Sequence, residues 1–314
     1  MKNVDEDKTK ALIEEISKTR NADILFVSGE LTRPNEIEFV KVITGRKRNP
    51  NVLLILVTPG GDADVAYKMA RCLLQNYNKY VICVSGWCKS AGTLLAIGAH
   101  EIILSDFGEL GPIDVQLGKA DEIGEYSSGL DLEEALDSLE KRAFQMFMNF
   151  MMSMKKYMRP LTLKTACEIS YHMMTNLLSP IYAKIDPLKI GDISRSINVA
   201  RRYGQRLDMQ AHNLKPKKLE SLVSGYPDHG FVIDYVEASA LFVNVSKPDE
   251  KLKELTESLG DGALIPNENG CCIEYLNEER GEDAANLSVV TAPELEQPEV
   301  IAETGARNRK VAGR

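Results

Sequence analysis

Short apolar runs alternate with amphipathic segments through roughly the first hundred residues of the chain. Four runs are rich in aliphatic and β-branched side chains and are bounded by Gly, Pro, Asp or charged residues: 23–29, 52–58, 80–86 and 101–105. Nearly every position within them is hydrophobic, which is typical of parallel strands covered on both faces. Between the second and third runs, Val65, Met69, Cys72 and Leu73 recur at helical spacing. This order predicts an α/β fold with a largely parallel sheet.

The middle of the chain, from about residue 131 to residue 223, has a helical pattern. Its first part is a long amphipathic stretch that we expect to end before Pro160, and its methionines are interpreted as adaptable packing or as an oligomer- or peptide-facing surface. Residues 230–236 are strand-like, and few order signals follow residue 259. We therefore expect a helical N-terminal arm over 1–20, one domain over 21–258 and a flexible tail over 259–314.

Charge and cysteine usage narrow the functional class. A net charge of −8 disfavours nucleic acid as a main partner, because neutralising phosphates requires a Lys/Arg surplus. The six cysteines have neither CxxC pairing nor zinc-site spacing, and no disulfide is needed in a chain of 314 residues. The N-terminus lacks a signal-peptide core, and no 18-residue apolar window predicts a membrane span. A cytoplasmic protein without metal or cofactor is the expectation.

Residues 84–99 predict a buried strand, a polar turn and a helix of small residues. Ser90 stands at the junction and is followed by Ala91 and Gly92. Its hydroxyl could satisfy a buried hydrogen bond, or it could be a nucleophile with room beside it for an acyl group. Cys88 is the alternative nucleophile, but a cysteine at a strand end is more simply interpreted as a small hydrophobic residue.

A second turn, Pro59-Gly60-Gly61, ends the run at 52–58 and precedes a predicted helix. Glycines permit backbone conformations that a Cβ forbids, and a helix N-terminus favours negative charge. Both turns fall at the carboxyl ends of predicted parallel strands, where α/β sheets bind ligands. Attack by Ser90 on a carbonyl would create an oxyanion, for which the amides of Gly61 and Ala91 are the natural donors.

The motifs "TPGG" (58–61), "SAGT" (90–93) and "LGPID" (110–114) resemble the ClpP/signal peptide peptidase superfamily of serine peptidases. Within it, the chain is most similar to the serine dehydrogenase proteinase family. The 29-residue step from Gly61 to Ser90 matches that family, and residues 224–242 resemble its closing segment. The resemblance implies a ClpP/crotonase-like spiral of β-β-α units that assembles as a homo-oligomer of rings or stacked trimers. It also implies hydrolysis of peptides or unfolded segments through an acyl-enzyme on Ser90.

The general base remains open between a histidine and a lysine. The family's residue order implies a triad of Ser90, Asp114 and His229, with three aspartates as reserve acids: Asp186, Asp228 and Asp234. A serine–lysine dyad is the alternative, with Lys141 as the base, 51 residues after Ser90. Lys89 adjoins Ser90, but its side chain is expected to point away from it.

Two other functional classes remain possible on the same fold. A crotonase-type acyl-CoA enzyme would use the same pair of amides for an enolate, although it needs no serine at this turn. A non-catalytic assembly or scaffold protein is the third class. No GxxxxGK[ST] motif is present, so any unfolding ATPase would be a separate chain.

Overall fold

The computed structural model describes residues 6–113, 116–118, 126–158, 160–268 and 270–277. A six-stranded sheet has the order β10-β1-β2-β3-β5-β9. Its parallel strands are β1 (Ala22–Ser28), β2 (Asn51–Val57), β3 (Lys79–Val84), β5 (Glu101–Leu104) and β9 (Val245–Ser246). The edge strand β10 (Cys272–Tyr275) is antiparallel to β1. The predicted α/β class with a largely parallel sheet is confirmed.

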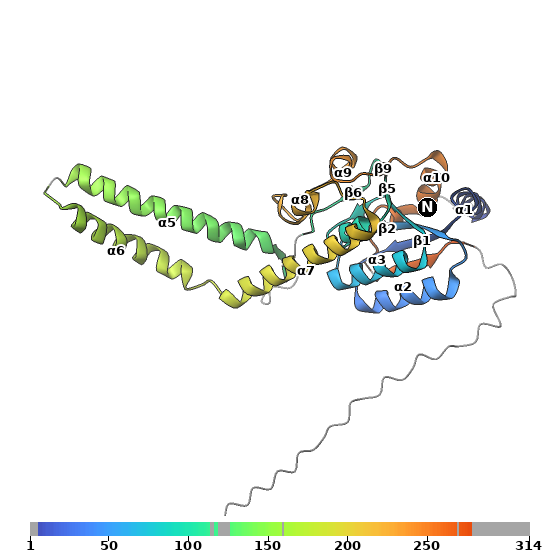
Figure 1. Ribbon diagram of the computed structural model, residues 1–314, viewed down its shortest axis with the longest axis horizontal. Coiled ribbons are helices and arrows are strands. Elements are labelled where there is room, and N and C mark those ends of the chain that lie inside the picture. Colours follow the sequence, from blue (N-terminus) through green and yellow to red (C-terminus); the bar gives the residue numbers. More distant parts are fainter. Residues whose placement is uncertain (1–5, 114–115, 119–125, 159, 269, 278–314) are drawn as a thin grey trace, which may run out of the picture. The chain divides into compact units, whose positions relative to one another are not determined.

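Helices cover both faces of this sheet, which explains why its strands are apolar at almost every position. On one face, Leu25 and Leu54 pack against three helices: α2 (Arg33–Arg46), α3 (Ala63–Asn76) and α4 (Ala91–Ile97). On the other face, Ile24 and Leu53 pack against α1 (Glu6–Arg20) and α10 (Glu250–Ser258) (Figure 1). Alternate residues of each strand therefore belong to two separate cores.

The strands β1, β2 and β3 are each followed by a short extended piece and then by a helix. The short pieces pair in parallel through the bridges Leu31–Gly61 and Thr58–Cys88, and through β4 (Trp87–Cys88) beside β6 (Glu109–Leu110). This repeating unit is the β-β-α unit that the family resemblance implies. It places the turn after β2 and the turn after β4 next to each other.

The predicted helical region contains three long helices. α5 (Gly129–Tyr157) ends before Pro160 as predicted, and it packs along α6 (Leu163–Tyr182), whereas α7 (Pro187–Ala211) packs against α3 and α4. The shorter elements are β7 (Gln116–Gly118), β8 (Tyr126–Ser128), α8 (Lys218–Ser224), α9 (Tyr235–Leu241) and the 3-10 turn η1 (Gly260–Ala263). Within the described part of the chain, no helix is both long and apolar enough to cross a membrane.

Three expectations differ from the structure. Residues 230–236 form no strand: Ile233 makes a single bridge to Leu110, and Asp234 then caps α9 by accepting a bond from the Glu237 amide at 2.9 Å. The N-terminal segment, expected to be an arm apart from the main domain, instead packs on the sheet through the buried apolar residues of α1. Ordered structure also continues past residue 259, because η1 and β10 complete the edge of the sheet beside β1.

A buried carboxylate on β1 fixes the loop between α2 and β2. Asp23 is fully buried, and its oxygens accept bonds from the amides of Arg48 and Asn49, both at 3.0 Å. The Tyr77 hydroxyl donates to the same carboxylate at 2.9 Å. Burial and the charge of Asp23 both raise the pKa of Tyr77, so its phenol stays protonated and can donate.

Asp23→Ala is expected to lower the free energy of unfolding by about 3 kcal/mol, because several buried donors lose their acceptor. Urea unfolding followed by circular dichroism measures this loss. The control is Asp106→Ala, which removes an exposed carboxylate paired with Lys247 and should change stability by less than about 1 kcal/mol. Equal losses in the two variants would contradict the anchoring role of Asp23.

Candidate active site

Ser90 occupies a strained turn between β4 and α4. Its backbone has φ 51° and ψ −112°, in a region that non-glycine residues rarely adopt and that costs about 1–3 kcal/mol. The same strand-to-helix geometry exposes the nucleophile in other serine hydrolases. Backbone bonds hold the turn, since Thr58 O accepts from the Lys89 amide at 3.0 Å and Lys89 O accepts from the Gly92 amide at 2.8 Å. Within the described residues, the Ser90 hydroxyl makes no hydrogen bond, so satisfying a buried partner is not its role.

The first glycine of the second turn, Gly60, lies directly against Ser90. A Cβ built on Gly60 would lie 2.9 Å from the Ser90 Cβ and 3.5 Å from its Oγ. Leu31 accepts a bond from the Asp62 amide at 2.9 Å and donates to Gly60 O at 2.8 Å, so it uses the groups on either side of the Gly61 amide. Among the described residues, neither the Gly61 amide nor the Ala91 amide donates a hydrogen bond. Each of the two turns therefore has one unused backbone donor within the described chain, and both residues line the same cavity as Ser90.

Packing against Thr58 and Cys88 explains Gly92. A Cβ there would lie 2.5 Å from Thr58 Cγ2 and 2.9 Å from Cys88 Sγ. The small residue after Ala91 is thus required by the contact between the two turns, whether or not an acyl group needs the space. Cys88 itself is fully buried, and burial raises the pKa of its thiol well above the usual value, which disfavours it as a nucleophile.

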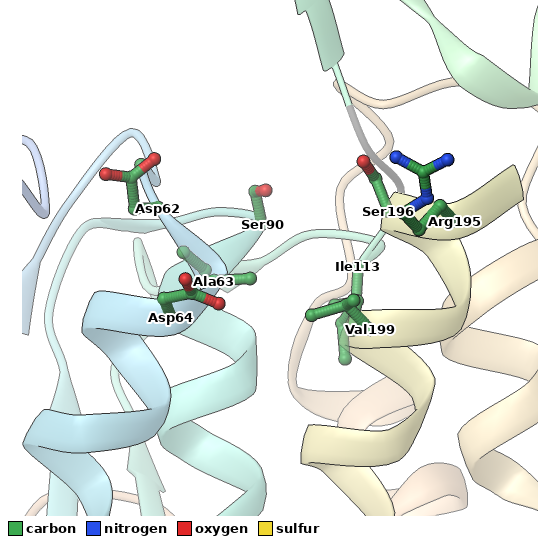
Figure 2. Close-up of a pocket in the computed structure, with 11 residues that line it drawn as sticks. Asp62, Ala63, Asp64, Ser90, Ile113, Arg195, Ser196 and Val199 are labelled. Atoms are coloured by element: carbon green, nitrogen blue, oxygen red, sulfur yellow. The ribbon is translucent and has the colours of Figure 1, made fainter. Parts of the chain in front are cut away.

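A cavity of about 360 Å³ opens in front of Ser90, between the start of α3 and the middle of α7. Figure 2 shows the Ser90 hydroxyl on one side and Arg195 and Ser196 of α7 across from it. Asp62 and Asp64 follow the glycines on the α3 side, and the remaining apolar lining includes Ile113, Val199 and Ala200. No local signal in the sequence marks the α7 residues, whereas the two aspartates could have been found from their place beside the diglycine turn.

Contacts between α3 and α7 set the spacing of the cavity walls. Tyr67 and Tyr203 stack with their ring centroids 4.3 Å apart, and the Tyr203 hydroxyl donates to Asp64 at 3.0 Å. Burial and this hydrogen bond raise the pKa of Tyr203. Arg195 pairs with Asp192 on its own helix at 3.3 Å. Asp62 is exposed, and its carboxylate has no partner among the described residues.

The structure brings Ser90, Gly60, Gly61 and Ala91 together, but it does not bring the candidate bases to the cavity. His229 is half-buried in the turn 228–231, and Lys141 is exposed on α5. Neither residue lines the cavity, and no other histidine or lysine of the described chain does so. Asp114, the proposed triad acid, lies outside the described residues.

The three reserve acids have local structural roles. Asp186 and Asp234 cap α7 and α9 by accepting backbone bonds from Leu188 and Glu237, both at 2.9 Å. Asp228 accepts a bond from the Gly230 amide at 2.6 Å within its own turn. Two helix caps and one side-chain turn account for the three carboxylates without a catalytic function.

Two proteins of one organism match parts of the chain in sequence. The chain is 24% identical over 188 residues to the uncharacterized protein MJ0137 of Methanocaldococcus jannaschii, a match that covers 51% of this chain and 66% of that protein. It is 29% identical over 89 residues to the uncharacterized protein MJ1495 of the same organism, covering 28% and 30%. The chain thus spans just under two thirds of the first relative and less than a third of the second.

Two solved structures of a membrane-bound stomatin-specific protease, 1510-N, also match. One mutant aligns over 76% of this chain and 84% of its own, with 14% identity and a TM-score of 0.42. A second mutant, in complex with a substrate peptide, aligns over 34% and 51%, with 21% identity and a TM-score of 0.28.

The family comparison falls on the segment that builds the two turns. A family model described as ClpP-like SDH-type serine proteinase matches residues 31–126. This range contains the diglycine turn, Ser90 and most of the described lining of the cavity. The resemblance inferred from the motifs is therefore confirmed over this segment: residues 31–126 match the ClpP-like, serine dehydrogenase-type proteinase family.

Proposed function

We propose that the chain is a serine peptidase that cleaves peptide bonds in peptides or unfolded segments through an acyl-enzyme on Ser90. One observation carries the proposal above all. A strained serine with an unbonded hydroxyl lies against a diglycine turn at the mouth of a cavity. Backbone strain of this kind persists where the surrounding structure holds it, and it is concentrated at functional sites.

The chemistry follows from the groups around Ser90. Its Oγ attacks the substrate carbonyl carbon while a base takes the hydroxyl proton, and the carbonyl oxygen becomes an oxyanion. The amides of Gly61 and Ala91 donate to this oxyanion, and each such donor is worth about 10²–10³ in rate. When the tetrahedral adduct collapses, the amine leaves with a proton and the acyl group stays on Oγ. Water then hydrolyses the ester and regenerates Ser90.

The first turn of α3 also stabilises the negative charge of the oxyanion. The Gly61 amide precedes a helix of 14 residues, whose N-terminal end favours negative charge. The Asp62 carboxylate beside it opposes part of this effect and gives the α3 wall a negative rim. The open cavity between α3 and α7 would accept a substrate side chain next to the scissile bond.

A non-catalytic assembly role is the second candidate, and one observation favours it. Within the described lining of the cavity there is neither an imidazole nor a lysine amine to take the proton of Ser90. A serine hydroxyl is a weak nucleophile without a base. The two candidates therefore differ in whether Ser90 is chemically activated.

Reaction with a fluorophosphonate probe tests this directly. We expect one covalent adduct, located on Ser90 by mass spectrometry, in the native protein and none after denaturation. The same assay on His229→Ala and Lys141→Ala identifies the base, because the variant that lacks it should lose most of its labelling. Absence of an adduct in the native protein would favour the non-catalytic role. A rise in melting temperature with coenzyme A, without an adduct, would favour the acyl-CoA class.

A further inference from the structure

Lys89, the residue before Ser90, has a buried side chain with a complete set of acceptors. Its side chain is 11% exposed, and its Nζ lies 3.1 Å from Glu109 Oε1. The same nitrogen donates to Leu110 O and Phe231 O, both at 3.4 Å. An ammonium has three protons to donate, and these three oxygens can satisfy all of them. Burying such a charge is costly without acceptors, so this arrangement requires a structural or functional reason.

The acceptors of Lys89 belong to two segments that are far apart in sequence. Glu109 and Leu110 form β6, which pairs with β4 immediately before the Ser90 turn. Phe231 ends the turn that contains His229, and Ile233, two residues later, exchanges two backbone bonds of 3.0 Å with Leu110. Lys89 therefore binds at the point where these two segments meet.

The aliphatic part of the side chain is enclosed as well. A Cβ built on Gly111 would lie 2.8 Å from Lys89 Cδ, so the chain after β6 passes directly over the lysine. The backbone of Lys89 is bound at the same time, through Thr58 O and the Gly92 amide. One residue is thus fixed at both its backbone and its side chain, immediately before a residue in a strained conformation.

We propose that Lys89 is a positioning residue, whose ammonium fixes β6 and the segment 228–233 against the Ser90 turn and so maintains the conformation of the nucleophile. The inference rests on the proposed function for its catalytic consequence, but the structural lock can be measured by itself. Lys89 acts through backbone and does not touch the reacting atoms: it does not line the cavity, and its Nζ is occupied by Glu109 and two carbonyls.

The test compares Lys89→Met with Lys89→Arg. Methionine keeps much of the apolar stem and removes the charge, so we expect the fluorophosphonate labelling rate of Ser90 to fall about 10–100-fold. Arginine keeps the charge and should restore at least part of the rate. Because a positioning residue does not exchange protons with Ser90, the pH profile of labelling should keep its midpoint. The matched control is Lys68→Met, which removes an ion pair with Glu36 on the α2–α3 surface and should leave the labelling rate unchanged.

Hydrogen–deuterium exchange provides a readout that is independent of chemistry. In Lys89→Met, the amides of Leu110 and Ile233 should exchange at least tenfold faster than in the unmodified protein, while amides of β2 stay protected. If the unmodified protein does not label, the peptidase proposal fails, and this exchange alone decides the role of Lys89. Unchanged exchange at both amides, or a displaced pH midpoint, overturns the positioning role.

If Lys89→Met does not fold, Glu109→Gln replaces it, with an expected 3–10-fold loss of labelling and faster exchange at Leu110. Unchanged values for both in Glu109→Gln overturn the inference.

Discussion

Ser90→Ala is expected to lower the rate of peptide hydrolysis by roughly 10⁴–10⁶-fold, because the variant retains the oxyanion donors but has no atom to form the acyl-enzyme. Hydrolysis of a fluorescence-quenched peptide library, measured under identical conditions for both proteins, gives the ratio. The melting temperature should change little, since the hydroxyl makes no hydrogen bond within the described residues and alanine keeps the same backbone. A loss of activity with retained folding separates the chemical role of Ser90 from a structural one.

Ser258→Ala is the matched control for this experiment. Ser258 lies on α10, on the opposite face of the sheet, where its hydroxyl donates to Leu255 O at 2.7 Å. Its removal should cost about 1 kcal/mol of stability or less and leave hydrolysis unchanged. Hydrolysis by Ser90→Ala within tenfold of the unmodified protein would rule out Ser90 as the nucleophile.

Gly61→Ala is expected to impair both folding and activity. A Cβ at this position would lie 2.3 Å from Leu31 O and 2.8 Å from Leu31 N, and backbone atoms cannot move aside as a flexible side chain can. The φ of 136° is also a conformation that L side chains rarely adopt. We expect a loss of about 2–4 kcal/mol in the free energy of unfolding. The turn must shift, so Ser90 labelling should fall by about 10²–10³, the contribution of one oxyanion donor.

Gly45→Ala controls for the general effect of adding a methyl group to a glycine. Gly45 lies in α2 with nothing within 4 Å of its would-be Cβ, and the substitution should raise stability by up to about 1 kcal/mol. Urea unfolding and the labelling rate measured on both variants complete the comparison. Full labelling of Gly61→Ala would show that the Gly61 amide does not hold the oxyanion.

The central sheet could be predicted closely from the sequence because each of its long strands is marked by its own apolar run. The four apolar runs coincide with β1, β2, β3 and β5 to within one or two residues at each end. A strand buried on both faces must be apolar at nearly every position, and few other elements of that length require this. The helix α3 was equally clear, since all four of its predicted apolar positions are buried.

Elements defined by distant contacts were not predictable in the same way. The edge strand β10 pairs with β1 across more than 240 residues. It has only four residues, and most of them are partly exposed or exposed, so its sequence lacks the continuous apolar run that would indicate a strand. The run at 230–236 was apolar enough to predict one, but the Asp234 cap directs the chain into α9. In both segments, hydrophobicity along the chain does not reveal the contact that decides the structure: pairing with β1 for β10, and the Asp234 cap for residues 230–236.

The candidate site was predictable in part for the same reason. Two turns after neighbouring parallel strands must lie at the same sheet edge, so the proximity of Gly60 and Ser90 followed from the order of the elements. The α7 wall of the cavity and the enclosure of Lys89 depend on how helices and loops pack over that edge. Neither the α7 wall nor the enclosure of Lys89 is marked by a sequence pattern in the residues that form it.

The interlocking of the two turns has a consequence for how such a site can change. Gly60 contacts Ser90, and Gly92 contacts Thr58, so each turn leaves no space for an added carbon in the other. A larger residue on one side is tolerable only together with a smaller one, or a displaced backbone, on its neighbour. An engineer who wished to transplant this centre into another sheet would have to move residues 58–61 and 88–92 as a single cassette.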